Sequence, residues 1–267
     1  GINELTQNSS GLISIANGHS LEAETISVTA GSAGLSVGVG SSLVGTGNTH
    51  NNYATIDVAA GGTIMDAGSI NNLATGIINF ADGGTLAADT DVSGDESITN
   101  AGVININGGT TAINIGGAGV FDNQKLLRLA SGTGVSVTGA MANTGTINMQ
   151  NGTATETVSV SGDYAGGGAL NIDINFDTDA SDTLVVGGDV TGPTTTVFVN
   201  DIGSTAVTGN DIVIASVTGT AAADAFELST PLSFGVLIYD ISQSGSDFVL
   251  GATGGYIAEV VGLEAFA

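Results

Sequence analysis

Cysteine and tryptophan are absent from the 267 residues, and proline occurs only as Pro193 and Pro231. The lack of cysteine excludes disulfides, cysteine-bound zinc and thiol catalysis. Because proline is so rare, no segment has the composition of a linker, which favours one continuous domain. No run of 18 apolar residues occurs, so the sequence predicts no transmembrane segment.

Positive charge is almost missing. Lys125 and Arg128 stand against 26 acidic residues, which gives a formal net charge of −24. Nucleic acids and anionic lipid surfaces bind through clustered lysine and arginine, so a nucleic-acid partner is excluded. A high charge with few aromatic residues is also typical of disorder, but here 42% of the residues are apolar and gather in short Val, Ile and Leu runs. We therefore expect a folded chain.

The apolar residues follow the period of a β-strand. Glycine contributes 43 residues, and Thr, Ser, Asn and Asp are spread throughout, all of which are poor in helix interiors. Short stretches in which apolar and polar residues alternate are each followed within a few residues by glycine or Asn-Gly. These stretches are residues 12–15, 25–28, 55–58, 103–106, 135–137 and 158–160.

An approximate repeat runs through the first half. The pattern Ile-Asn-apolar recurs around Asn79, Asn105, Asn114 and Asn148, and the steps from Asn79 to Asn105 and from Asn105 to Asn148 are 26 and 43 residues. Those steps suit one and two coils of a parallel β-helix, whose coils take roughly 20–25 residues. At about 22 residues per coil the chain would make roughly 12 coils. An array of β-sandwiches is the alternative, but its cores are usually marked by more aromatic residues.

We therefore predict an all-β fold, a right-handed single-stranded parallel β-helix (solenoid) with a C-terminal β-rich cap. Residues 1–151 are assigned to plain β-helix coils. Residues 152–255 are assigned to terminal coils and the cap, because most of the Phe and Tyr residues lie there. Such a cap would cover the unpaired N–H and C=O groups at the end of the helix.

The segment from Ala165 to Leu250 resembles the C-terminal autochaperone region of pertactin-like passenger domains in type V (autotransporter) secretion. The residues that carry the resemblance are Ser181-Asp182-Thr183-Leu184, Asp189-Val190-Thr191-Gly192, Asn200, Ala225-Phe226-Glu227-Leu228, Gly235–Ile241 with Tyr239, and Phe248–Leu250. One position departs from the family pattern, since Phe248 stands where the family often has Trp.

The resemblance implies how the chain is exported. It implies a passenger that an outer-membrane translocator barrel carries to the bacterial cell surface or the extracellular space. In residues 256–267, Ile257, Val260, Val261 and Glu264 have helical spacing. By the resemblance, these residues are the remnant of a linker helix toward a translocator barrel that this sequence does not contain.

No constellation of catalytic residues stands out. The nucleophile motif G-x-S-x-G is absent, and the nearest phrase, Gly94-Asp95-Glu96-Ser97, has an extra residue between the acid and the serine. His19 and His50 are the only imidazoles that could act as a general base. Both lie in polar Asn/Ser/Gly stretches, so we interpret them as surface-loop histidines and predict no catalytic residues.

Two acidic stretches are candidates for calcium, which prefers oxygen ligands. The candidate ligands are Asp173, Asp177, Asp179 and Asp182, and a second stretch holds Asp82, Asp89, Asp91, Asp95 and Glu96. Neither stretch matches an EF-hand loop or the calcium-binding β-roll repeat. We therefore interpret both as solvated acidic turns and keep specific calcium binding as the alternative. No other cofactor is predicted.

Asn72, Asn100 and Asn143 are candidates for an internal asparagine ladder, in which stacked side chains satisfy buried polar groups coil after coil. Ordinary turn asparagines are the alternative. Lys125 and Arg128 are assigned to a charged turn and a strand edge.

The expected function is that of a non-enzymatic extracellular structural or adhesive protein, with the chain itself as a partner if it assembles into fibres or a matrix. Two alternatives stay open. The chain could belong to a hydrolase passenger whose active site lies outside this segment, or it could recognise glycans or a host protein along one face of the β-helix. The scarcity of aromatic residues argues against stacking on carbohydrate.

Overall fold

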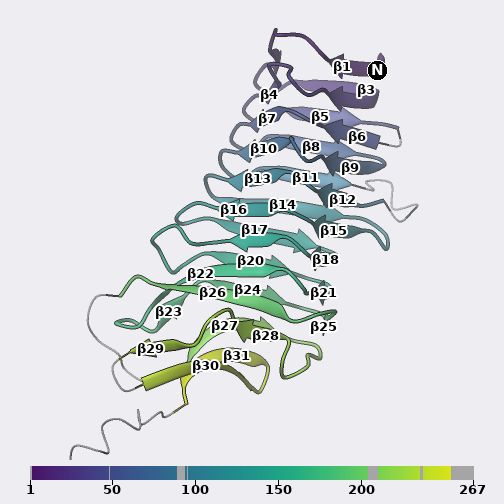
Figure 1. Ribbon diagram of the computed structural model, residues 1–267. Helices are drawn as coiled ribbons and strands as arrows, with labels where there is room; N and C mark the ends of the chain where they lie inside the picture. The colour runs from purple at the N-terminus through teal and green to yellow at the C-terminus, as the bar shows by residue number, and fades with distance from the viewer. Residues whose placement is uncertain are drawn as a thin grey trace, which may run out of the picture.

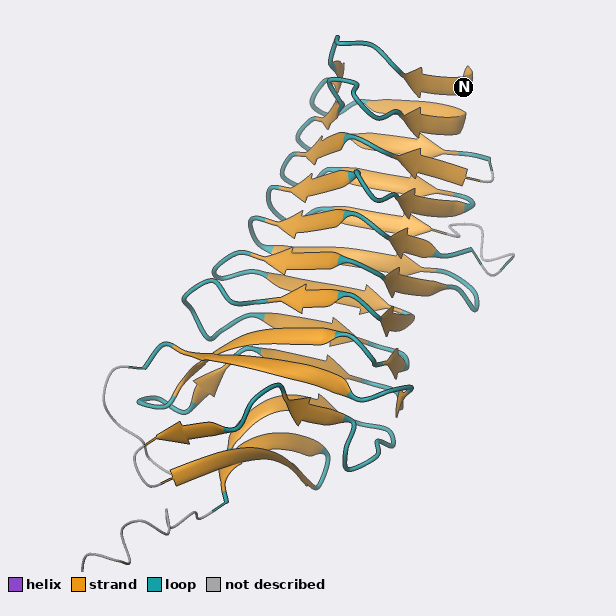
Figure 2. Ribbon diagram, in the orientation of Figure 1, coloured by secondary structure: helices purple, strands orange, loops and turns teal. Residues whose placement is uncertain are grey.

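The computed structural model describes residues 2–47, 49–88, 94, 96–203, 210–234 and 237–253. Within these residues every regular element is a strand and no helix occurs (Figure 2). The strands wind as a solenoid from the N-terminal turns to the C-terminal end (Figure 1). The predicted all-β solenoid is thereby confirmed. The expected linker helix at 256–267 lies outside the described residues.

The solenoid consists of three columns of stacked parallel strands. The first column is β1 (Ile2–Gln7), β3 (Ser20–Val28), β5 (Ser42–Gly45), β8 (Thr63–Asp66), β11 (Thr85–Ala88), β14 (Thr110–Ile115), β17 (Gly134–Thr138), β20 (Thr157–Val160), β24 (Thr183–Val186) and β27 (Ile212–Val217). The second column is the end of β3, then β6 (Thr49–Asn52), β9 (Ser69–Asn72), β12 (Ile98–Asn100), β15 (Val120–Asn123), β18 (Ala140–Asn143), β21 (Tyr164–Ala165) and β25 (Val190–Thr191).

The third column forms a separate sheet. It is β2 (Ile13–Ile15), β4 (Leu35–Val37), β7 (Thr55–Val58), β10 (Ile77–Phe80), β13 (Val103–Ile106), β16 (Leu126–Leu129), β19 (Thr146–Asn148), β22 (Ala169–Asn175), β26 (Thr195–Asp201) and β28 (Phe226–Leu228). Asn79 aligns with Asn105 one turn later, and Asn105 aligns with Asn148 two turns later through Arg128. The repeat seen in the sequence therefore has the spacing that we assigned to it.

The number of coils was overestimated. In the described part of the chain the solenoid makes about 8 turns, not roughly 12. Two features of the structure account for the difference. Turns lengthen along the chain, from 22 residues between Thr63 and Thr85 to 31 residues between Leu184 and Ala215. The last strands also leave the parallel stack and form the cap.

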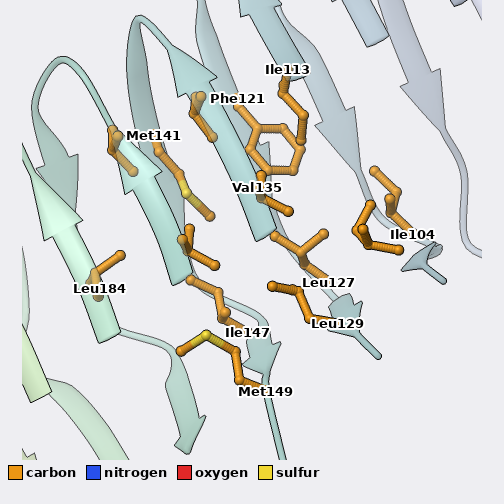
Figure 3. Packing of buried hydrophobic residues seen from close by; sticks show 14 of the residues in the cluster. Ile104, Ile113, Phe121, Leu127, Leu129, Val135, Met141, Ile147, Met149 and Leu184 are labelled. Atoms are coloured by element: carbon orange, nitrogen blue, oxygen red, sulfur yellow. The ribbon is translucent and has the colours of Figure 1, made fainter. Parts of the chain in front are cut away.

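The core is a continuous column of apolar side chains inside the solenoid. Strands of four residues repeat one burial pattern, in which the second and fourth side chains point inward. Ile104, Leu127 and Ile147 from successive turns thus lie above one another in the interior, with Met149 beside them (Figure 3). Burying one such side chain contributes roughly 1.5–3 kcal/mol. No single turn could bury its own inward residues, so the stability depends on stacking.

The C-terminal end is closed by antiparallel strands, as the predicted β-rich cap requires. β29 (Leu232–Phe234) pairs with β30 (Leu237–Ser244), which pairs with β31 (Asp247–Ala252), and β31 pairs back onto β27. A further short strand, β23 (Ala180–Ser181), pairs antiparallel with β22. Because β31 occupies the edge of β27, that strand offers no open template to another chain.

Aromatic pairs fill the space under the cap. The rings of Phe226 and Phe248 meet edge to face with centroids 4.8 Å apart, and those of Phe176 and Tyr239 lie 4.7 Å apart. All four side chains are buried. Among the described residues, no helix is long and apolar enough to cross a membrane.

Candidate functional site

The two histidines occupy opposite environments. His19 lies exposed at a turn, as the sequence predicts. The prediction for His50 was wrong, because His50 lies in β6 and is fully buried between Ile26 and Ile70 of the neighbouring turns. Both ring nitrogens lack a hydrogen-bond partner, and burial lowers the pKa of His50 to about 4. A neutral, buried imidazole without a partner is not placed to act as a general base.

The error has a physical reason. The sequence Thr49-His50-Asn51-Asn52 is polar throughout and therefore looks like a turn, but its burial alternates as in every other strand of the solenoid. His50 and Asn52 point inward, so the interior of this strand is polar. Polarity alone could not distinguish this strand from a loop.

Five asparagines form an inner asparagine ladder, namely Asn52, Asn72, Asn100, Asn123 and Asn143. All five are fully buried at the ends of consecutive strands of the second column. Each of the first four side chains donates from Nδ2 to Oδ1 of the next, at 2.7 to 2.9 Å. The ladder predicted for Asn72, Asn100 and Asn143 is confirmed, while Asn52 and Asn123 were missed.

The ladder also ties the second column to the third. The remaining Nδ2 hydrogen of each side chain points to a backbone carbonyl that begins a strand of the third column, as in Asn100 to Leu126 at 2.9 Å. Both amide hydrogens of each asparagine are therefore used, which is what a fully buried amide requires. At the last step Asn143 Nδ2 meets the hydroxyl of Tyr164 at 3.3 Å. Tyr164 is fully buried, and this burial raises the pKa of its hydroxyl.

A second polar row lies on the outside of the third column. Asn79 Nδ2 donates to Asp57 Oδ1 at 2.7 Å, and Asn105 Nδ2 donates to Asn79 Oδ1 at 2.8 Å. We call Asp57, Asn79 and Asn105 the outer polar row. It borders a shallow depression of about 530 Å³, whose lining includes Ser36, Asp57, Asn79 and Asn107. This depression is open to solvent, and its lining mixes hydrogen-bonding groups with the apolar side chains of Val58, Ala59 and Ala81.

The two cations are not part of a buried site. Arg128 is exposed in β16, where it continues the outer polar row in register between Asn105 and Asn148. Lys125 Nζ donates to the carbonyl of Ala74 at 2.8 Å on the surface. Lys125 lies in the bend between β15 and β16, as predicted, but Arg128 lies within β16, which is paired on both sides and is therefore not a strand edge.

Three fully buried carboxyl groups, Glu156, Asp173 and Asp182, gather where the third column passes to the first. We call them the carboxyl trio. Asp182 Oδ1 accepts from the backbone N–H of Glu156 at 3.0 Å, and Oδ2 accepts from that of Asp173 at 2.7 Å. Asp173 Oδ2 accepts from the backbone N–H groups of Asn151 and Gly152 at 2.7 and 2.6 Å. The trio thus holds loops of successive turns together.

The four candidate calcium ligands do not converge. Asp173 and Asp182 are buried in the trio and face backbone N–H groups. Asp177 and Asp179 lie in the turn between β22 and β23, where Asp179 accepts from Asn210 Nδ2. No group of three or more His, Cys, Asp or Glu residues among the described positions has the geometry to hold a metal ion. In the second acidic stretch, Asp89, Asp91 and Asp95 lie outside the described residues.

The chain matches a known protein family over part of its length. Residues 135–241 match the model of a family described as Autochaperone Domain Type 1. The matched stretch runs from β17 to β30 and contains the carboxyl trio, Tyr164 and one of the two aromatic pairs under the cap, Phe176 with Tyr239. It overlaps the segment in which the sequence alone carries the resemblance. No curated protein matches the chain.

Proposed function

Because the autochaperone match and the β-solenoid fit an autotransporter passenger with an autochaperone region, we propose that this chain is a non-enzymatic structural or adhesive rod. An autotransporter passenger needs an outer-membrane translocator, and the family implies secretion to the cell surface or the extracellular space. The role of the rod after secretion is the part that we propose.

One observation carries the proposal. Many side chains that elsewhere serve catalysis or metal binding are here part of the solenoid interior. The inner asparagine ladder bonds to itself and to the backbone, the carboxyl trio faces backbone N–H groups, and His50 is enclosed in the core. Such an interior stabilises a long rod but leaves these groups inaccessible to a substrate. This arrangement supports a protein that acts through its surface.

We propose the outer polar row as the surface through which the rod recognises a partner. It combines carboxylate and amide groups with a depression of about 530 Å³, and Arg128 continues the row. The row repeats once per turn, so its spacing along the rod is close to the roughly 4.8 Å between neighbouring strands. A partner with regularly repeating polar groups would suit this spacing.

Display on bacteria tests the proposal. Cells that carry the chain on a translocator barrel are expected to adhere to surfaces or to one another more than cells that carry the barrel alone. The double variant Asn79→Ser and Asn105→Ser should reduce this gain. A matched control, Asn148→Ser with Asn171→Ser, changes the same column outside the depression. No gain in adhesion or aggregation at equal display would refute the adhesive role.

Self-assembly is tested separately by sedimentation of the purified chain. A net charge of −24 makes copies repel one another, and this repulsion weakens as salt shortens the Debye length from about 10 Å at 0.1 M. Association that strengthens with salt or calcium would support a fibre or matrix role. A monomer under all conditions would leave only a solitary rod.

A further inference from the structure

Glu156 and Asp182 pose an electrostatic problem that the fold must solve. Both side chains are fully buried and hydrogen-bonded to each other. Two adjacent carboxylates cannot both be charged at low cost in such a site, because burial and like-charge repulsion disfavour the second charge. A single proton between them removes the repulsion and supplies the donor that their contact needs.

The surroundings determine which carboxyl group stays charged. Glu156 Oε1 accepts from the backbone N–H of Gly132 at 2.6 Å and from Thr153 Oγ1 at 2.8 Å, and Oε2 accepts from Thr155 N–H at 3.3 Å. These donors favour the charged form of Glu156. The proton therefore resides on Asp182. A protonated Asp182 can still accept the hydrogen bonds that the backbone N–H groups of Glu156 and Asp173 donate to it.

We propose that the carboxyl trio is a proton-holding latch, which joins successive turns inside the autochaperone region and tightens when the Glu156–Asp182 pair keeps its proton. Its hydrogen bonds connect Glu156 to the turn that contains Gly132, and Asp173 to the turn that contains Asn151. Asp182 in turn binds the backbone of both Glu156 and Asp173. The latch concerns folding of the autochaperone region and does not depend on the adhesive role proposed above.

No cation among the described residues compensates the trio. The element that carries Asp173 is β22, and Asn200 of β26 donates to Asp173 from the next turn. The other charged groups on adjoining elements are acidic, namely Asp177, Asp179, Asp201 and Asp211. Arg128 of β16 is exposed, and Lys125 donates to Ala74. Because no positive partner is at hand, a proton is the simplest means of neutralising the pair.

The pKa values give the direction of the pH response. Burial and the hydrogen bond and charge of Glu156 raise the pKa of Asp182 to about 8. Burial alone would raise the pKa of Glu156, but the hydrogen bonds from Asp182, Thr153, Gly132 and Thr155 outweigh it, so that this pKa is lowered. Between about pH 4.5 and pH 8 the folded pair thus holds one proton that the unfolded chain has lost. Stability from the latch is greatest at the acid end of this range and is lost as the pH rises through about 8.

Denaturant unfolding of the full chain across this pH range tests the latch. The quantity compared is the equilibrium constant for folding of the wild type divided by that of Asp182→Asn. We expect this ratio to fall as the pH rises, by up to about tenfold per pH unit for one proton. The matched control is Asp224→Asn, which removes the same charge from an exposed position of the same region. The ratio of wild type to this control should vary much less with pH.

An equal pH dependence in the wild type and Asp182→Asn would overturn the proposal. If Asp182→Asn does not fold, infrared spectroscopy of the wild type decides the question. With labelled aspartate carboxyl groups, a protonated carboxyl band should be present at about pH 7.5, where Asp66, whose pKa burial raises to about 6, is mostly ionised, and it should vanish by about pH 9.5. Its absence at the lower pH would likewise overturn the latch. In a folded Glu156→Gln variant, the band should vanish at a lower pH than in the wild type, because the charge of Glu156 that raises the pKa of Asp182 is gone.

Discussion

The turns before Asn143 and the turns after Glu156 solve the same packing problem in different ways. Before Asn143, short strands carry mostly aliphatic side chains, with Phe80 and Phe121 as buried rings, and one inner asparagine ladder runs down the second column beside the buried carboxyl group of Asp66. After Glu156, the turns are longer, aromatic rings join the aliphatic side chains of the interior, and the buried polar residues among those described are three carboxyl groups and Thr195. The last asparagine of the ladder, Asn143, donates to the hydroxyl group of Tyr164 instead of to another asparagine, so the two regions meet at this tyrosine.

The difference shows what each kind of interior is suited to. A ladder requires nearly the same register in every turn, because each amide must reach the next one. It is therefore suited to a regular stack that grows by nearest-neighbour contacts. Aromatic rings cover more area per residue and tolerate irregular turns. They are suited to the end of the rod, where the turns lengthen and the chain must cover its own last edge.

The largest expected effect comes from the aromatic pair under the cap. Replacing Phe226 or Phe248 with alanine should lower the free energy of unfolding by about 3–5 kcal/mol, because each ring is buried and the two rings contact each other. Denaturant unfolding followed by circular dichroism measures this loss. The double variant should lose less than the sum of the two single variants, since one contact is counted twice.

Phe198 provides the matched control. This ring is 43% exposed on the outside of β26, in the same region of the chain. Phe198→Ala should therefore cost far less than either buried change. Similar losses at all three positions would mean that the cap does not stabilise the molecule through its buried rings.

A smaller effect is expected from the middle of the inner asparagine ladder. Asn100→Ala removes the donor to Asn123, the acceptor for Asn72 and the bond to the Leu126 carbonyl. Leaving buried partners unsatisfied costs about 1–3 kcal/mol each, partly relieved by small shifts, so we expect a loss of about 2–3 kcal/mol in total.

The control for the ladder is Asn79→Ala in the outer polar row. It also removes two side-chain hydrogen bonds, but one is exposed and the other only partly buried, so water can replace most of what is lost. Its cost should stay within about 0.5 kcal/mol. If both asparagine variants lost the same stability, burial of the ladder would not be the source of its strength.

Much of the solenoid could be predicted from the sequence because its signals are local. The alternation of apolar and polar residues predicts the short strands. The steps between Asn79, Asn105 and Asn148 predict the number of residues per turn. The number of turns could not be obtained this way, because it depends on how many residues leave the strands as loops. From the sequence, Asp173 and Asp182 are recognisable only as members of an acidic stretch, and their burial could not be predicted.

The buried polar groups were harder to predict than the apolar core. Asn52 and His50 belong to a strand whose four residues are all polar, so nothing in its composition marks the interior. Only the register with Ile26 and Ile70 identifies His50 as inward-facing. Likewise, the meeting of Glu156 with Asp182 depends on how loops of two turns come together, which no local pattern encodes. The division into residues 1–151 and 152–255 stays a prediction.

The smallest expected effect concerns His50 and distinguishes the two regions by their response to acid. Burial lowers its pKa to about 4 from the usual 6.5 of a histidine, so below about pH 6.5 the unfolded chain binds a proton that the folded chain does not. Stability from the neutral form is therefore lost as the pH falls from about 6.5 toward 4. We expect the wild type to lose about 1.4 kcal/mol more than His50→Leu between about pH 7.5 and pH 5.5.

His19→Leu is the matched control, since His19 is exposed in a turn and the substitution is the same. It should keep the acid response of the wild type. The carboxyl trio responds in the opposite direction, because its proton is retained in acid. Acidification should thus weaken the turns around His50 through the histidine itself, while it tightens those around Asp182. Burial also raises the pKa of Asp66 in β8 to about 6, so Asp66 opposes His50 within the first region, and the difference between wild type and His50→Leu isolates the histidine. Hydrogen exchange resolved by region, in wild type and His50→Leu, separates these responses. If acid loosened both regions equally, the contrast between the two interiors would not extend to their electrostatics.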